Sequence, residues 1–251
     1  MDKKVVSREY KMELEYAAHS ITGLTHKINE DSYRLLGNTI KLVEKAGRGQ
    51  LFSVFDGMGS APRGGEAANF MSNSLLDFFR SNRFENSAIG IKELLLQANL
   101  ELFCWGQDER ARRPEGACAG TLAWFNEKNV TIFHAGDTFG LLLRVDQHDN
   151  QYENLTTSQG IGNGIFSYFG IGENILLEIK QIQAEEGDIV VLCSDGIADN
   201  RAVSCSLVAE VVRKNILYSP ERAANELCRL AKLRGSVDDI TAVVIEVIDF
   251  E

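Results

Sequence analysis

The sequence carries acidic residues at four places where an apolar run ends or a tight turn begins. These are Glu30-Asp31 in INEDSY, Asp56 in VFDGMG, Asp195 in VLCSDGIAD, and Asp238-Asp239 in SVDDITAVV. Taken singly, each acid has a structural explanation, because Asp-Gly is a common turn dipeptide and Asp before a helix is an ordinary N-cap. Brought together, such strand ends would crowd negative charge into one cleft, and divalent cations would relieve the repulsion. Oxygen ligands without His or Cys favour the hard ions Mg²⁺ or Mn²⁺.

The glycine-rich turn after Asp56 allows two kinds of chemistry. Glycine lets a backbone approach either a phosphate held by amide groups or a metal ion held by the carboxylate. A nucleotide site fits poorly in DGMGSAPRGGE, because no Lys-Ser/Thr follows as in a P-loop and the third glycine of a dinucleotide fingerprint is misplaced. A second helix is also predicted after the first, where a nucleotide-binding fold would place a strand.

Strand-like runs must position these acids. Residues 14–46 contain LEYAAHSI, DSYRLLG and NTIKLVEKA, with a Gly37-Asn38 turn signal, and 51–55 is a short apolar strand that ends at Asp56. Further predicted strands are AGTLAWF, NVTIFHA, FGLLLRV, NILLEIKQI, DIVVLCS and the final ITAVVIEVI.

Helical spacing of apolar residues predicts two pairs of helices, over 64–79 and 87–105 and over 203–214 and 220–234. Because helices follow one another in pairs, the order favours antiparallel sheets with helices packed on them over a parallel α/β fold. No linker, low-complexity stretch or internal repeat divides the chain, so we expect residues 1–251 to form one domain.

Composition narrows the class of protein. A net charge of −10 argues against a nucleic-acid partner, which needs clustered Lys and Arg. The five cysteines show no CxxC spacing and the four histidines no HExxH pair, which disfavours zinc and favours a reduced compartment. The first residues lack a signal-peptide core and no apolar run approaches about 18 residues, so we expect a cytoplasmic protein without a membrane partner.

Five short blocks carry a resemblance to a known family. NEDSY, VFDGMG, HAGDTFG, VLCSDGIAD and DDITAVV, in this order over nearly the whole chain, resemble the signature blocks of the metal-dependent Ser/Thr protein phosphatases of type 2C, in their bacterial form. The resemblance implies an α+β fold, a four-layer sandwich of two antiparallel β-sheets flanked by α-helices. It agrees with the non-alternating order of elements.

The resemblance also implies the site residues. Asp56 would bridge two metal ions, Gly57 would contact metal through its backbone carbonyl, Asp195 and Asp238 would hold one ion, and Glu30 the other. Asp31 would support the bound waters, which places Asp56, Glu30 and Asp31 at the catalytic centre.

The implied reaction is hydrolysis of phosphoserine and phosphothreonine in proteins, by a water that the two ions activate. It needs no covalent nucleophile, so Ser60 and Cys193 are not candidates. The implied partners are a phosphorylated protein substrate and a Ser/Thr kinase that opposes the phosphatase. The alternative is a weakly active or inactive phosphatase-like module that binds a phosphorylated regulatory partner.

The sequence departs from the family pattern at several positions. His26 stands where the family usually has a phosphate-binding arginine, so His26, Lys27 and Arg63 are the candidates for substrate binding. Ala117 replaces an aspartate that often holds a third metal ion, so a third ion is not predicted. In GDTFG the usual arginine is missing, and Asp137 is expected to be a structural hydrogen-bonding residue rather than a ligand.

Overall fold

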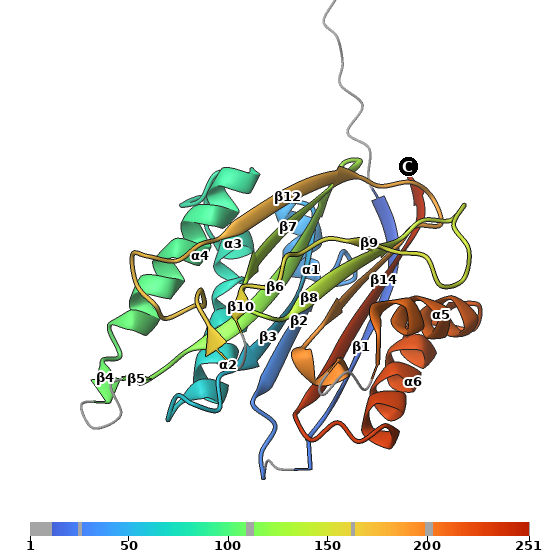
Figure 1. The fold of residues 1–251 in the computed structure, drawn as a ribbon. Coiled ribbons are helices and arrows are strands. Elements are labelled where there is room, and N and C mark those ends of the chain that lie inside the picture. The colour runs from blue at the N-terminus through green and yellow to red at the C-terminus, as the bar shows by residue number, and fades with distance from the viewer. Residues whose placement is uncertain (1–11, 25–26, 109–112, 162–163, 199–202, 251) are drawn as a thin grey trace, which may run out of the picture.

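The computed structural model describes residues 12–24, 27–108, 113–161, 164–198 and 203–250. Two five-stranded antiparallel sheets form its centre (Figure 1). The β14 sheet has the strand order β1-β14-β13-β8-β9 and the β6 sheet the order β12-β7-β6-β3-β2. In the β14 sheet the strands are β1 (Met12–Ile21), β14 (Ile240–Phe250), β13 (Ile189–Cys193), β8 (Phe139–Leu143) and β9 (Glu153–Asn154). In the β6 sheet they are β12 (Glu178–Gln183), β7 (Asn129–Ala135), β6 (Cys118–Asn126), β3 (Gln50–Gly57) and β2 (Asp31–Leu36).

The two sheets pack face to face around an apolar layer that both supply. Phe52 and Phe125 of the β6 sheet and Leu192, Val243 and Ile245 of the β14 sheet belong to this layer and are buried. Burial of side chains from both inner faces is what joins two sheets into a sandwich, because apolar burial stabilises by about 25 cal/mol per Å².

Helices cover the outer face of each sheet (Figure 1). Over the β6 sheet lie α1 (Lys41–Ala46), α2 (Gly64–Ser74), α3 (Asp77–Arg80) and α4 (Ala88–Phe103), and over the β14 sheet lie α5 (Cys205–Ile216) and α6 (Pro220–Leu233). Serine side chains cap α4, α5 and α6 by accepting a backbone N–H of the first turn, and Pro220 begins α6. The predicted four-layer α+β sandwich is confirmed.

Short elements complete the fold, namely β4 (Gln107–Asp108), β5 (Arg113–Pro114), β10 (Gly160–Ile161), β11 (Gly164–Ile165) and a 3₁₀ turn over Asp195–Ile197. In the described ranges no helix has the length and apolar character needed to cross a membrane. The described cysteines, all five of the chain, are free thiols.

Two predicted elements differ from the structure. NTIKLVEKA was expected as a strand, but Lys41–Ala46 is a helix that ends at Gly47 in a left-handed conformation, with φ of 60°. A glycine at this position is a common helix stop, and it outweighs the alternation of Ile40 and Leu42. The helix expected over 64–79 is broken after Ser74. Ser72 and Ser74 donate their hydroxyls to carbonyls three residues earlier and so compete with the helical backbone.

Candidate active site

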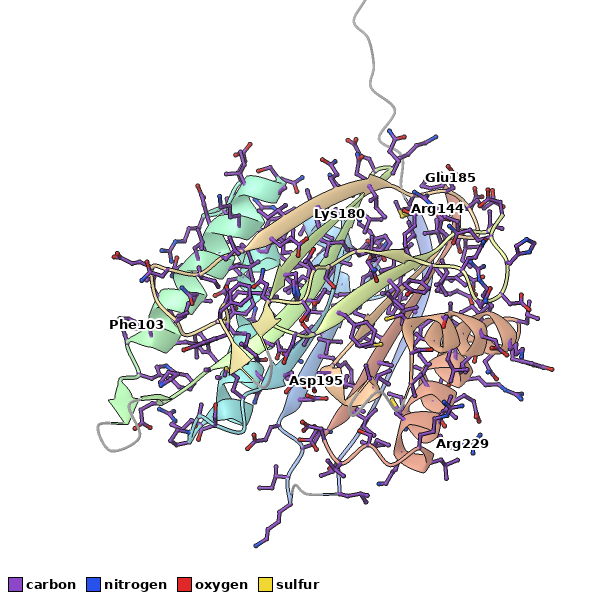
Figure 2. All side chains as sticks on the ribbon, in the orientation of Figure 1. Phe103, Arg144, Lys180, Glu185, Asp195 and Arg229 are labelled. Atoms are coloured by element: carbon purple, nitrogen blue, oxygen red, sulfur yellow. The ribbon has the colours of Figure 1, made fainter. Side chains whose placement is uncertain are left out.

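Strand pairing brings the first acids together. In the antiparallel pair of β2 and β3, Asp31 lies directly opposite Asp56, at the ends of both strands. Asp195 follows β13 after one residue, and Asp238 precedes β14 by one residue. Figure 2 shows Asp195 between the lower ends of the two sheets. The edge of the sandwich therefore collects acids from strands that are far apart in the sequence.

Two cavities lie at this edge. One, of about 440 Å³, is lined by Asp56, Gly57, Asp137, Asp195 and Asp238, together with Met58, Tyr168 and others. The second, of about 580 Å³, is lined by Glu30, Asp31 and Arg63 among others. Because Asp31 and Asp56 are cross-strand neighbours, the two cavities adjoin at this pair. All the metal-ligand candidates predicted from the sequence thus lie on one of the two cavity walls.

The crowding of acids shifts their protonation. Burial, followed by the charges of Asp31 and Asp195, raises the pKa of Asp56 well above its ordinary value. Burial raises the pKa of Asp31 to about 7, against the lowering effect of hydrogen bonds from Thr241 and Ser194. The pKa of Asp195 also rises to about 7, through burial and then the charges of Asp137 and Asp238. Without a cation, burial and mutual repulsion favour the protonated forms of Asp31, Asp56 and Asp195 near neutral pH.

Several carboxylate oxygens have no protein donor to satisfy them. In the part of the chain that the structure describes, Asp31 Oδ1 and Asp195 Oδ1 are buried without a hydrogen-bond partner. Buried polar atoms are normally satisfied, so such oxygens require an explanation. No three His, Cys, Asp or Glu side chains in the described ranges stand ready to hold one ion. Mg²⁺, however, prefers oxygen ligands and usually keeps several waters, so the oxygen-only donor set fits such an ion without three preformed contacts.

The glycine turn holds Asp56 against the following helix. A Cβ on Gly57 would come within 2.5 Å of the carbonyl carbon of Gly64, so no side chain fits where the end of β3 meets the start of α2. The Gly57 N–H donates to the Glu30 carbonyl at 3.2 Å, and the Met58 N–H donates to Ala117 at 3.0 Å. Glycine therefore serves a close backbone approach here, and the turn presents the Asp56 side chain to the cavity.

Of the three substrate-binding candidates, the two that the structure describes differ in where they lie relative to the second cavity. His26 lies outside the described residues. Lys27 is exposed, next to Ile28 on the rim of the second cavity. Arg63 lines that cavity, but its guanidinium donates to Glu66 at 2.7 and 3.0 Å and lies 4.1 Å from the ring centre of Trp105. The Arg63 guanidinium therefore already contacts Glu66 and Trp105 in the absence of a ligand.

Some residues at the site have roles that the sequence did not predict. Asp137, expected as a structural residue, lines the same cavity as Asp56 and Asp195, and burial raises its pKa. Its place after the apolar run of β7 is the same signal that identified the other acids. Asp239 is buried and accepts backbone N–H groups of Gly23 and Glu30, which no local pattern could indicate. His134 of β7 is buried and contacts Thr121 Oγ1 at 3.0 Å.

Known proteins resemble this chain in sequence and fold. The serine/threonine protein phosphatase PstP of Mycobacterium tuberculosis strain H37Rv is 25% identical over 255 residues, which cover 95% of this chain and 46% of PstP. The chain thus spans about half the length of the curated relatives it matches.

Two solved structures illustrate the shared fold. A crystal structure of a bacterial serine phosphatase is 21% identical, with a TM-score of 0.78 over 94% of this chain and 99% of that one. The catalytic domain of PstP in complex with two manganese ions is 24% identical, with a TM-score of 0.75 over 94% and 99% of the two chains. The family model for protein phosphatase 2C matches residues 27–234. The chain therefore belongs to the protein phosphatase 2C family.

Proposed function

We propose that this chain is a protein phosphatase that hydrolyses phosphoserine and phosphothreonine in proteins with the help of two divalent cations, Mg²⁺ or Mn²⁺. The observation that carries the proposal is the convergence of Asp31, Asp56, Asp195 and Asp238 at one edge of the sandwich, with raised pKa values for the first three. Membership of the family and the two manganese ions of the PstP catalytic domain support it. We also take residues 1–251 as a single domain of this type.

The residues present fit a pair of cations. Asp56, which lines the first cavity and pairs across the strands with Asp31 of the second, would contact both ions, with Gly57 adding its carbonyl oxygen. Asp195 and Asp238 would hold one ion and Glu30 the other. Bound there, the cations would activate a water for attack on phosphorus and offset the charge of the phosphoryl oxygens. Asp137, on the wall of the same cavity, is a further candidate ligand, although the sequence analysis favoured a structural role for it.

Two further side chains, Asp31 and Cys193, bear on the proposed reaction. Asp31 receives a hydrogen bond on Oδ2 from the Thr241 hydroxyl at 2.5 Å, which fixes its orientation, while Oδ1, buried without a protein partner in the described residues, would support a water at the site. Cys193 is fully buried, and burial raises its pKa well above the usual value, so its thiol stays protonated and inert. This agrees with direct attack by water rather than a covalent intermediate.

The substrate would be a phosphorylated protein segment laid across the two open cavities. Lys27 and Arg63 are the described cationic candidates for its phosphate, both on the side of Glu30. A Ser/Thr kinase must supply such a substrate, since that reaction forms the ester bond that this one breaks.

The test is phosphate release from p-nitrophenyl phosphate and from a phosphothreonine peptide, with Mn²⁺ and with EDTA. We expect turnover only with metal, and a fall of at least about 100-fold in Asp56→Asn, the scale on which loss of one charge-stabilising group lowers kcat. Asp249→Asn, an exposed acid at the far end of β14, is the matched control and should match the wild type. Turnover that persists in EDTA or in Asp56→Asn contradicts the proposal. Metal and phosphopeptide binding without any turnover would instead indicate a binding module.

A further inference from the structure

The buried carboxylate of Asp239 binds both ends of the connection between β1 and β2. Asp239 is 2% exposed, and each of its oxygens accepts a different backbone N–H. Oδ1 accepts from Gly23 at 2.8 Å and Oδ2 from Glu30 at 2.7 Å. The two donors are separated by seven positions in the sequence, so a single side chain fixes where the segment 23–30 begins and where it ends. We call this arrangement the Asp239 clamp.

Close packing and a chain of side-chain bonds support the clamp. A Cβ on Gly23 would lie 2.3 Å from the carbonyl carbon of Asp238, so the segment starts in direct contact with the backbone of a ligand candidate. Ser20 Oγ contacts Thr241 Oγ1 at 2.7 Å and accepts from Asn29 Nδ2 at 2.8 Å. The segment is therefore held directly by Asp239 and, through Ser20 of β1, by Thr241 of β14.

The clamp reaches the candidate ligands through Glu30. The Glu30 N–H donates to Asp239, while the Glu30 carbonyl accepts the N–H of Gly57 at 3.2 Å. The backbone of Glu30 is thus held between the start of β14 and the end of β3. A shift of Glu30 would also move Asp31, the next residue, away from its register with Asp56.

We propose that Asp239 is a positioning residue for the metal site, which acts through the backbone of Glu30 and does not itself ligate a cation. Both of its oxygens already accept backbone N–H groups, whereas the neighbouring Asp238 lines the cavity of Asp56 and Asp195. The clamp also anchors the segment on which Lys27 and Ile28 are exposed. The metal-related part of this inference rests on the proposed function, but the clamp itself does not.

The first test is amide hydrogen exchange, followed residue by residue by NMR in metal-free protein. In Asp239→Ala we expect the amides of Gly23 and Glu30 to lose protection, while those of β13 keep theirs. Asp239→Asn should be intermediate, because its amide oxygen can accept one of the two bonds while its NH₂ group faces the other donor. If Asp239→Ala does not fold, the exchange of Asp239→Asn alone tests the clamp. Wild-type protection of both amides in Asp239→Asn and Asp239→Ala overturns the clamp.

The second test separates positioning from plain stability. We expect the Mn²⁺ concentration for half-maximal phosphate release, and the calorimetric dissociation constant for Mn²⁺, to rise about tenfold or more in Asp239→Asn, as for residues that orient metal ligands. Excess Mn²⁺ should restore part of the rate, and Asp249→Asn should behave as wild type. A lower melting temperature with unchanged Mn²⁺ dependence overturns the positioning role. If the wild type itself shows no metal-dependent release, the proposed function fails, and hydrogen exchange still decides the clamp.

Discussion

Raising the pH should destabilise the metal-free protein, because its acids hold protons that the unfolded chain releases. The folded pKa values of Asp31 and Asp195 are both about 7, against 3.8 for the ordinary side chain. The stability that the protonated forms confer is complete below the ordinary value and is lost as the pH rises through about 7. The free energy of unfolding should therefore fall between about pH 6 and pH 8.

The expected size follows from the same values. For a folded pKa of about 7 and an unfolded one of 3.8, each carboxyl contributes a loss of about 1 kcal/mol over this range. The raised pKa of Asp56 acts in the same direction. The pKa of His134 is lowered by burial, so that its titration opposes the effect. Between pH 6 and pH 8 the free energy of unfolding of Asp195→Asn should fall by at least about 1 kcal/mol less than that of the wild type. Because both proteins contain His134, its contribution cancels in this comparison.

The assay is urea unfolding in EDTA at about pH 6, 7 and 8, followed by tryptophan fluorescence and extrapolated linearly to water. Asp249→Asn is the control and should keep the wild-type slope. Added Mn²⁺ should stabilise more at the highest pH, because protons and cations compete for the same oxygens. If the free energy of unfolding of wild type and Asp195→Asn changes identically with pH, the assignment of buried, protonated acids is refuted.

Three substitutions test other parts of the structure. Gly57→Ala places a methyl group within 2.5 Å of the Gly64 carbonyl carbon. The free energy of unfolding should therefore fall by about 1–3 kcal/mol, and Mn²⁺-dependent turnover should fall with it. Wild-type stability in urea would contradict the close approach. Arg63→Ala should raise KM for a phosphopeptide by up to about fivefold with kcat unchanged, as for an exposed charge already shared with a neighbour, and a fall in kcat alone would disagree. Asp188→Ala removes the buried partner of Arg144, 2.7 Å away, and should cost about 3 kcal/mol in urea unfolding without changing turnover per folded molecule; unchanged stability would count against a structural ion pair.

Much of the fold could be predicted from the sequence, because long periodic segments carry their own signal. The helices over 88–103, 205–216 and 220–233 and the strands on either side of them follow the predicted order. The errors fall where a local feature overrides periodicity. Gly47 ends a short helix within a strand-like pattern, and serine hydroxyls interrupt the first long helix.

The site could be predicted in part. Asp56 and Asp195 were expected at the ends of buried strands, and the structure brings both to one cavity, while their roles as ligands remain predictions. The position of Asp137 on the same wall was missed, because only the packed fold shows which way such a side chain points. The use of Asp239 could not be predicted, since its bonding partners lie over 200 residues away in sequence. The sequence also could not show that Arg63 already binds Glu66.

The acids at the edge of the sandwich come from both of its sheets. Asp56 ends a strand of the β6 sheet, whereas Asp195 and Asp238 flank strands of the β14 sheet. Elsewhere the sheets are joined mainly by the buried apolar layer, with a few polar contacts such as that of Gln50 Nε2 to the Met12 carbonyl. A cation bound by acids of both sheets would add a cross-link between them at this edge. Chelation would remove that link and leave hydrogen bonds, such as that of Thr241 to Asp31, to join the sheets there.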